Sequence, residues 1–154
     1  MVCVGKRVKN FTLPATGDQD LSLNDFKGRK LILYFYPRDN TSGCTREGQD
    51  FRDLYSEFMS AGADILGVSR DSVKTHENFR NKHEFPFQLL SDGEEALCRQ
   101  FDIIHEKTLY GRKHMGIVRS TFLIDAQGIL RQEWRKVRVP GHAGAVLEAV
   151  KALS

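Results

Sequence analysis

The sequence predicts an α/β fold in which a central mixed sheet is flanked by helices on both faces. Residues 30–36 are apolar and rich in aromatic side chains, which is typical of a strand buried on both faces. The segment that follows repeats its hydrophobic residues with a helical period. Farther along, strand-like and helix-like segments alternate before a hairpin and a last helix. Parallel strands joined by helices, with an antiparallel hairpin added, form such a sheet.

The first strand, at residues 30–36, is bounded by Gly28 and Pro37. A polar turn at residues 39–43 leads into a helix. Its hydrophobic face is formed by residues that recur at i, i+3, i+4, i+7 and i+8, namely Phe51, Leu54, Tyr55, Phe58 and Met59. Gly62 is predicted to end this helix, because glycine is common just past a helix end. The turn that follows the strand lies at its carboxyl end, which is where α/β sheets usually carry their sites.

The later elements follow from the same patterns. We expect strands at residues 63–68 and 87–90, a polar surface helix at 72–83, a short helix at 94–101, a hairpin of residues 120–125 and 129–137 around a turn at 126–128, and a packed helix at 141–153. The locally basic residues 107–114 are predicted to form a solvated loop that could border the site or contact a reductant.

Length and composition indicate one domain, residues 1–154, because 154 residues are about one ordinary domain. The 23 Lys and Arg against 20 Asp and Glu leave a formal charge of +3, which favours neither nucleic acid nor a membrane surface as a partner. The longest apolar stretch, residues 31–36, is too short to span a membrane. We identify no signal peptide, and three cysteines without an export signal favour a reducing cytoplasmic location.

Cys44 is the cysteine whose surroundings point to chemistry. It follows a polar Thr-Ser-Gly turn and falls in the first turn of the predicted helix. Unpaired N–H groups and the helix dipole favour a thiolate over a thiol at such a position. Thr41 is near enough in sequence to direct its hydroxyl at the sulfur, and Pro37 fixes the entry into the turn. The alternative is that Cys44 is a small helix-start residue and Thr41 its cap.

The segment around Cys44 resembles the peroxidatic segment of the peroxiredoxins, whose core is Pro-x-x-x-Thr-x-x-Cys, and more closely that of the bacterioferritin comigratory protein (PrxQ) subfamily. The resemblance extends along nearly the whole chain. The matching blocks are residues 11–14, 23–28, 34–47, 89–92, 116–125 and 139–142. Several blocks in the right order are far more specific than one short motif.

This resemblance implies a thioredoxin-like fold and the reduction of hydrogen peroxide or organic hydroperoxides. It identifies Cys44 as the peroxidatic cysteine, Pro37 and Thr41 as its motif partners, and Arg119 as the active-site arginine. A guanidinium beside the sulfur would stabilise the thiolate and orient the peroxide. Glu47 also matches and would support the arginine. The sulfur would become a sulfenic acid. The reductant would be thioredoxin, glutaredoxin or a small thiol.

The chain departs from many relatives at Gln49, which occupies the position of their resolving cysteine. Two routes of recycling therefore remain open. In one, an external thiol reduces the sulfenic acid directly. In the other, Cys98 forms a disulfide with Cys44 after a local rearrangement. Cys98 lies on the apolar face of a short predicted helix and is more easily explained as a buried thiol. Cys3 is in the N-terminal segment and has no assigned role.

Two other functions fit the sequence less well. A dithiol oxidoreductase needs a second cysteine three positions from the first, but positions 41 and 47 are Thr and Glu. A non-enzymatic binding or chaperone-like module predicts a silent Cys44 and no peroxide consumption. The five histidines show no metal-ligand spacing, so we expect neither a metal nor another cofactor. We expect a monomer.

Overall fold

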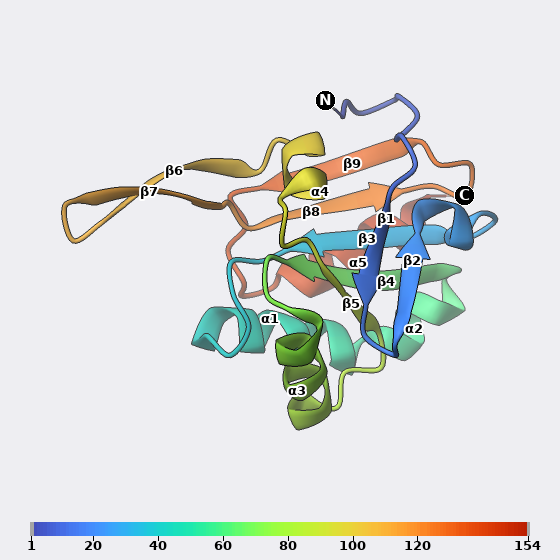
Figure 1. Cartoon of the computed structure of the whole chain (residues 1–154). Coiled ribbons are helices and arrows are strands. Elements are labelled where there is room, and N and C mark those ends of the chain that lie inside the picture. Colours follow the sequence, from blue (N-terminus) through green and yellow to red (C-terminus); the bar gives the residue numbers. More distant parts are fainter. Residues whose placement is uncertain (1, 154) are drawn as a thin grey trace.

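The structure is a computed structural model that describes residues 2–153, and it has the predicted α/β architecture (Figure 1). Its strands are β1 (Thr12–Ala15), β2 (Gln19–Ser22), β3 (Lys30–Phe35), β4 (Ala63–Ser69), β5 (Gln88–Ser91), β6 (Ile104–Leu109), β7 (Arg112–Ile117), β8 (Ser120–Ile124) and β9 (Leu130–Arg135). Its helices are the 3₁₀ helix η1 (Leu23–Phe26), α1 (Ser42–Asp53), α2 (Tyr55–Ser60), α3 (Val73–His83), α4 (Ala96–Gln100) and α5 (His142–Ala152).

Seven strands form one mixed sheet in the order β2-β1-β5-β4-β3-β8-β9. Strands β3, β4 and β5 are parallel, so their carboxyl ends meet at one edge of the sheet. Strand β8 runs antiparallel to β3, with Ser120 opposite Phe35. The start of β8 therefore lies beside the end of β3. This register brings the residues before β8 to the same edge as the residues after β3.

Two hydrophobic cores cover the two faces of the sheet, because successive side chains of β3 point to opposite faces. On one face Ile32 and Tyr34 pack with side chains from α1, α2, α3 and α5. On the other face Leu31 and Leu33 pack with α4, η1 and the N-terminal segment. Helices cover both faces, as predicted, but the first face carries most of them.

The structure departs from the sequence prediction in three places. The helix predicted to run to Gly62 is divided at Leu54, whose N–H donates to Phe51 O in a tight turn that separates α1 from α2. Strands β1 and β2 form an antiparallel pair near the N-terminus, where no element was assigned. Their four-residue length gives too few positions for a periodic pattern.

The third difference is at residues 107–114, predicted to be a solvated loop. They belong to the β6–β7 hairpin, which pairs only with itself and projects from the body at the left of Figure 1. Most of its side chains are exposed, so the alternation that marks a half-buried strand is absent.

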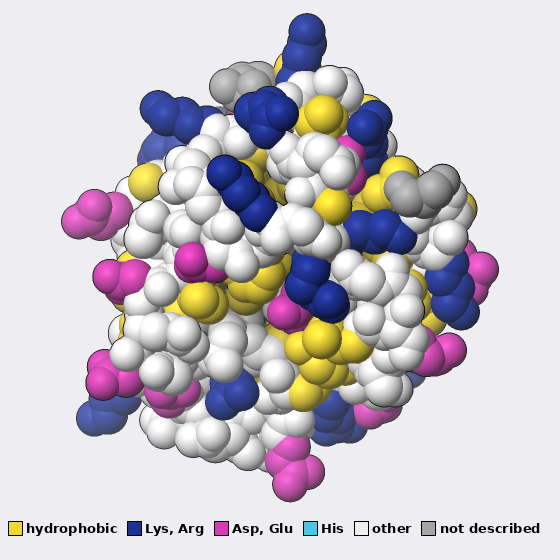
Figure 2. Space-filling model, turned by 90° about the vertical axis from the view of Figure 1, so that its right-hand side faces the viewer, with side chains coloured by type: hydrophobic (Ala, Val, Ile, Leu, Met, Phe, Trp, Pro, Cys, Tyr) yellow, Lys and Arg dark blue, Asp and Glu magenta, His cyan; other side chains and the backbone are white. Residues whose placement is uncertain are grey.

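The opposite end of the molecule holds a cavity of about 390 Å³, whose lining includes Val8, Phe26 and Leu31. Figure 2 shows this end, where hydrophobic, basic and acidic side chains are mixed. Leu31 is at the start of β3, whereas the turn that carries Cys44 follows its end. No helix among residues 2–153 combines the length and hydrophobicity that a membrane crossing needs.

Candidate active site

Cys44 is the third residue of α1, which begins at Ser42 just after the turn that follows β3. Its side chain is buried, with 2% exposed. The N–H groups of a first helical turn have no intrahelical acceptors, and the helix dipole adds positive charge there. Both effects favour a negatively charged sulfur at this position.

Arg119 reaches Cys44 because it directly precedes β8, whose first residue pairs with the end of β3. Its Nη2 donates to Cys44 Sγ at 3.3 Å, and its Nη1 donates to Glu47 Oε1 at 2.6 Å. Gly43 leaves room for the guanidinium, since an added Cβ there would lie 3.2 Å from Nη2. One planar group thus bonds the sulfur and a carboxylate together.

Glu47 lies one helical turn after Cys44, and its side chain is 1% exposed. Burial raises the pKa of this carboxyl to about 7, although the charge and hydrogen bond of Arg119 act to lower it. Its Oε2 atom is buried without a hydrogen-bond partner among residues 2–153. Glu47 can therefore change its charge near neutral pH while it remains beside the arginine.

Tyr34 is a further polar group at this site. Its ring is buried and stacks on Phe51, with the centroids 4.7 Å apart. Within the described residues its hydroxyl has no hydrogen-bond partner. Burial raises its pKa well above the usual value, and the negative charges of Glu47 and Asp39 raise it further. The sequence identified Tyr34 only as a core residue, because nothing local marks its closeness to these charges.

Thr41 and Pro37 lie in the same turn as Cys44 but do not contact its sulfur through a hydrogen bond in this structure. Thr41 is exposed, and its hydroxyl donates to Arg38 O at 3.0 Å. The sequence led us to expect that hydroxyl to point at the sulfur. The hydroxyl instead donates to the carbonyl of Arg38, three residues earlier in the same turn. Pro37 is half-buried just after β3.

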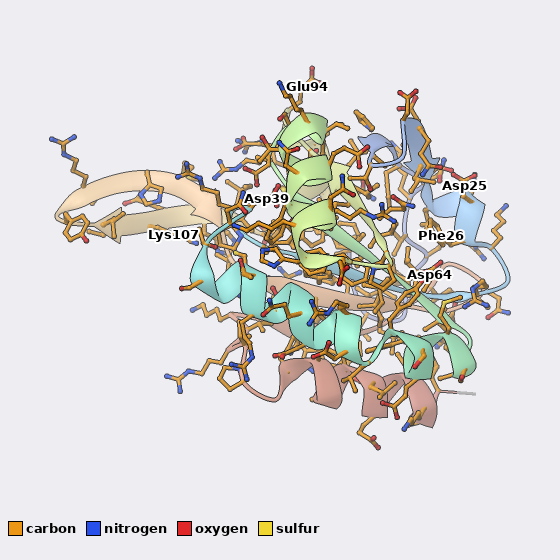
Figure 3. The ribbon with its side chains drawn as sticks, turned by 90° about the horizontal axis from the view of Figure 1, so that it is seen from below. Asp25, Phe26, Asp39, Asp64, Glu94 and Lys107 are labelled. Carbon is orange, nitrogen blue, oxygen red and sulfur yellow. The ribbon has the colours of Figure 1, made fainter. Side chains whose placement is uncertain are left out.

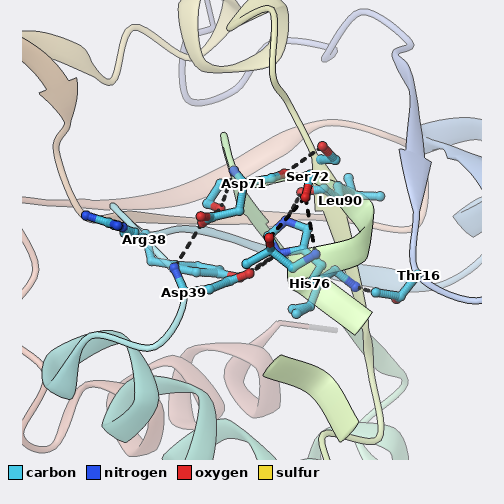
Figure 4. Close-up of polar contacts among 12 residues, drawn as sticks. Thr16, Arg38, Asp39, Asp71, Ser72, His76 and Leu90 are labelled. Atoms are coloured by element: carbon cyan, nitrogen blue, oxygen red, sulfur yellow. Dashed lines mark hydrogen bonds and ion pairs between the residues drawn. The ribbon is translucent and has the colours of Figure 1, made fainter. Parts of the chain in front are cut away.

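A buried polar network anchors the turn to α3 and was not predicted (Figures 3 and 4). Asp39 Oδ2 lies 2.6 Å from His76 Nδ1, and its Oδ1 accepts from Tyr36 Oη at 2.6 Å. Asp71 accepts from the Asp39 N–H at 2.9 Å. His76 Nε2 lies 2.8 Å from Leu90 O, which can only accept, so this nitrogen donates. The turn before Cys44 is thus fixed by hydrogen bonds to two other segments, through Asp71 after β4 and His76 in α3.

Asp39, Asp71 and His76 also place one ligand atom each within 4.8 Å of one another. The hydrogen bonds of the network already use these atoms. Both ring nitrogens of His76 have partners, and one oxygen of Asp71 accepts from the Asp39 N–H and from the hydroxyl of Ser69. A metal ion would have to displace these bonds, so the donor set fits a hydrogen-bonded network better than a metal site.

Cys98 belongs to a different environment. It is buried in α4, within the core on the sheet face opposite to that of Cys44. Its N–H donates to Asp92 Oδ2 at 2.7 Å. Burial, followed by the hydrogen bond and charge of Asp92, raises the pKa of its thiol far above the usual range. Cys3, Cys44 and Cys98 are all free thiols, and Cys3 is exposed.

His142 is the first residue of α5. Its Nε2 lies 2.8 Å from Thr121 Oγ1, and its side chain is buried. Burial and the nearby charge of Arg119 lower its pKa to about 4. The ring is therefore neutral near pH 7 and adds no charge beside the arginine.

Among the residues singled out from the sequence, the structure joins Cys44, Arg119 and Glu47 by hydrogen bonds and leaves Cys98 outside the cluster. The cysteine lies at the start of a helix that follows a central parallel strand, and the arginine comes from the antiparallel neighbour of that strand. This arrangement in a mixed sheet defines a thiol site on a thioredoxin-like fold. Comparison with known proteins gives the family. Residues 4–133 match the AhpC/TSA family, and the chain belongs to it.

Its relatives include peroxiredoxin Bcp of Xanthomonas campestris, 56% identical over 92% of this chain and 90% of the relative, and peroxiredoxin Bcp of Bacillus subtilis, 44% identical over 98% and 96%. A solved structure of the X. campestris bacterioferritin comigratory protein, studied for its alkyl peroxide reduction, has a TM-score of 0.88 at 55% identity, covering 92% of this chain and 90% of that chain. A PrxQ variant from Xylella fastidiosa has a TM-score of 0.94 at 44% identity, covering 99% and 97%. The chain is thus a peroxiredoxin, a thiol-dependent peroxidase, as the sequence resemblance indicated.

Proposed function

We propose that Cys44 is the peroxidatic cysteine and that it reduces hydrogen peroxide and organic hydroperoxides. The thiolate sulfur attacks the terminal peroxide oxygen, so that an S–O bond forms as the O–O bond breaks. The sulfur is oxidised to a sulfenic acid, and the leaving oxygen takes a proton and departs as water or an alcohol. The observation that carries this proposal is the 3.3 Å hydrogen bond from Arg119 Nη2 to Cys44 Sγ.

Arg119 supports the reaction in two ways. Its positive charge stabilises the thiolate, and its N–H groups can donate to the peroxide oxygens, on which negative charge develops as the O–O bond breaks. Glu47 positions this guanidinium through the 2.6 Å ion pair. Pro37 shields the sulfur from water. Thr41 turns its hydroxyl from Arg38 O toward the substrate.

For recycling, we propose that an external thiol reduces the sulfenic acid. One thiol attacks the sulfur, forms a mixed disulfide and releases water. A second thiol then breaks that bond, restores Cys44 and leaves as the oxidised disulfide. Gln49 has no thiol with which to attack the sulfenic acid. Cys98 lies on the opposite face of the sheet, and its raised pKa disfavours the thiolate that such an attack needs. The alternative, a Cys44–Cys98 disulfide, requires α4 or the start of α1 to unfold locally.

The test is to treat the protein with one equivalent of hydrogen peroxide, without reductant and with a sulfenic-acid trap such as dimedone, and to map the products by mass. We expect a single trapped adduct on Cys44. Cys98→Ser is the matched control and should give the same adduct and the same turnover with dithiothreitol. Cys44→Ser should consume no peroxide. A prompt Cys44–Cys98 disulfide, with loss of turnover in Cys98→Ser, would establish the two-cysteine route instead.

A further inference from the structure

The β6–β7 hairpin is an exposed element with no assigned role. It pairs with no strand of the seven-stranded sheet, so within residues 2–153 the outer edges of both its strands lack sheet partners. Isolated two-stranded hairpins are marginally stable in water. Its tip is formed by Tyr110 and Gly111, both with positive φ. Exposed edges of this kind are common sites of association.

The hairpin also carries hydrophobic side chains in solvent. Leu109 is 57% exposed, Tyr110 96% and Met115 50%, and these are three of the large exposed hydrophobic side chains among residues 2–153. Leu109 and Tyr110 lie at the free end, whereas Met115 is opposite Glu106, nearer the base and on the other face of the hairpin. Aromatic side chains that are exposed beside other apolar groups mark interaction sites more often than isolated ones do.

The charge of the hairpin is mainly positive. Lys107, Arg112 and Lys113 are opposed only by Glu106, which lies 3.6 Å from Lys113. Two copies of the hairpin placed together would bring like charges face to face, which disfavours self-association. A partner with acidic side chains around an apolar patch would complement both features.

The base of the hairpin adjoins the site. Strand β7 ends two residues before Arg119, and the Val118 N–H closes the base by donating to Ile103 O at 2.8 Å. Arg70 contacts Met115 O at 3.4 Å from the body. Lys107, which Figure 3 labels, is half-buried in β6, where burial and the nearby charge of Arg119 lower its pKa. A molecule seated on the hairpin would therefore lie next to the turn that carries Cys44.

We propose that the β6–β7 hairpin is the docking surface for the protein thiol that reduces oxidised Cys44, a partner with an acidic surface around an exposed apolar patch. This inference rests on the proposed function, because it takes recycling by an external thiol as given. A reductant must bring its own sulfur to Cys44, so its docking surface has to lie beside the site. The hairpin combines that position with exposed apolar side chains and a charge that selects acidic partners.

The experiment measures peroxide turnover by the full chain with two reductants. One is an acidic thioredoxin kept reduced by its reductase, and the other is dithiothreitol, which needs no docking surface. Tyr110→Asn removes the exposed ring but leaves an Asn-Gly turn, which hairpins favour. Arg112→Glu reverses one charge. Lys27→Glu, an exposed position at the opposite end of the molecule, is the matched charge control.

Each hairpin variant should raise the KM for thioredoxin at least about fivefold, as loss of an interface anchor does. Turnover with dithiothreitol and all parameters of Lys27→Glu should stay at the parent values. Added salt should raise the parent KM and have less effect on Arg112→Glu, because salt screens the attraction.

An unchanged KM in both hairpin variants overturns the docking proposal, as does a parent that turns over with dithiothreitol but not with thioredoxin. A parent dimer that Tyr110→Asn dissociates, with KM unchanged, would show that the hairpin joins two copies instead. If the parent consumes peroxide with neither reductant, the proposed function itself fails, and the docking proposal fails with it. The dithiothreitol assay therefore separates the two failures.

Discussion

Arg119 forms an ion pair with the buried Glu47, with Nη1 and Oε1 2.6 Å apart, and the same guanidinium also donates to the sulfur of Cys44. The two acceptors lie one turn apart on α1, so they match the two outer nitrogens of one planar group. A charge change at either acceptor therefore alters how strongly Arg119 holds the other.

Arg119→Lys should lower the rate constant for oxidation of Cys44 by about 100-fold or more, the scale seen when a donor to developing negative charge is removed. Lysine keeps the charge but has no fork that can bond the sulfur and Glu47 at once. Stopped-flow mixing with hydrogen peroxide measures this rate directly. Arg138→Lys, an exposed position, should keep the parent rate. A parent-like rate in Arg119→Lys would show that charge alone is sufficient.

Glu47→Gln should change how stability depends on pH. Burial raises the pKa of Glu47 from 4.5 to about 7, so the folded protein keeps this proton after the unfolded chain has lost it. As the pH rises from 4.5 to 7, the titration of Glu47 therefore lowers the parent's free energy of unfolding by about 3 kcal/mol. Below pH 4.5 this titration has no effect on stability. Glutamine has no such titration. The stability of Glu47→Gln relative to the parent should rise across that interval and then level off.

Urea unfolding of the two proteins at pH 4.5, 6 and 8 tests this prediction, because the other titrating groups are shared and cancel in the difference. Asp53→Asn, in which an exposed carboxylate is replaced, is the control. A stability difference between Glu47→Gln and the parent that is constant with pH would mean that Glu47 is ionised throughout the interval.

The sequence predicted the elements that have a strong local signal. The continuous apolar run identified β3, and the repeat of Phe51 and Phe58 identified the hydrophobic face of α1 and α2. The hairpin β6–β7 was missed because its side chains face solvent on both sides. No period then distinguishes it from a loop.

The contacts of the site were harder to predict, because they join segments far apart in the chain. Arg119 meets Cys44 only through the antiparallel register of β3 and β8, which no local pattern specifies. Its assignment depended on the family motif. Asp39 and His76 show the same limit, since one precedes α1 and the other lies within α3. His76 stands in no motif that we could interpret from the sequence, and the peroxidatic motif that contains Asp39 assigns that residue no role.

His76→Asn should destabilise the fold by about 1–3 kcal/mol, because it removes the 2.6 Å hydrogen bond to the buried side chain of Asp39. Asp39→Asn should also destabilise, and the double variant should lose less than the two single losses added together. Urea unfolding of the four proteins gives this coupling. His105→Asn, at an exposed position, should change stability by no more than about 0.5 kcal/mol. Additive losses would show that the two side chains act independently.

Gly48→Ala should lower stability by about 1–3 kcal/mol, the range found for overpacked cores. Gly48 follows Glu47 in α1, and an added Cβ would lie 2.4 Å from the ring of Phe85. That ring stacks on Phe87, with centroids 5.3 Å apart, and is 3% exposed, so it has little room to move. Relief would have to come from a shift of α1, which carries Cys44 and Glu47. The peroxide rate should therefore fall as well.

Gly144→Ala is the matched control. Gly144 is also a helical glycine, in α5, but nothing lies within 4 Å of the Cβ that alanine would add. The higher helix propensity of alanine should stabilise this variant by up to about 1 kcal/mol. Urea unfolding and stopped-flow peroxide assays compare the two variants with the parent. If Gly48→Ala and Gly144→Ala had equal free energies of unfolding, Phe85 would be able to move aside without loss of stability. The close packing of α1 against that ring would then not fix the position of the site.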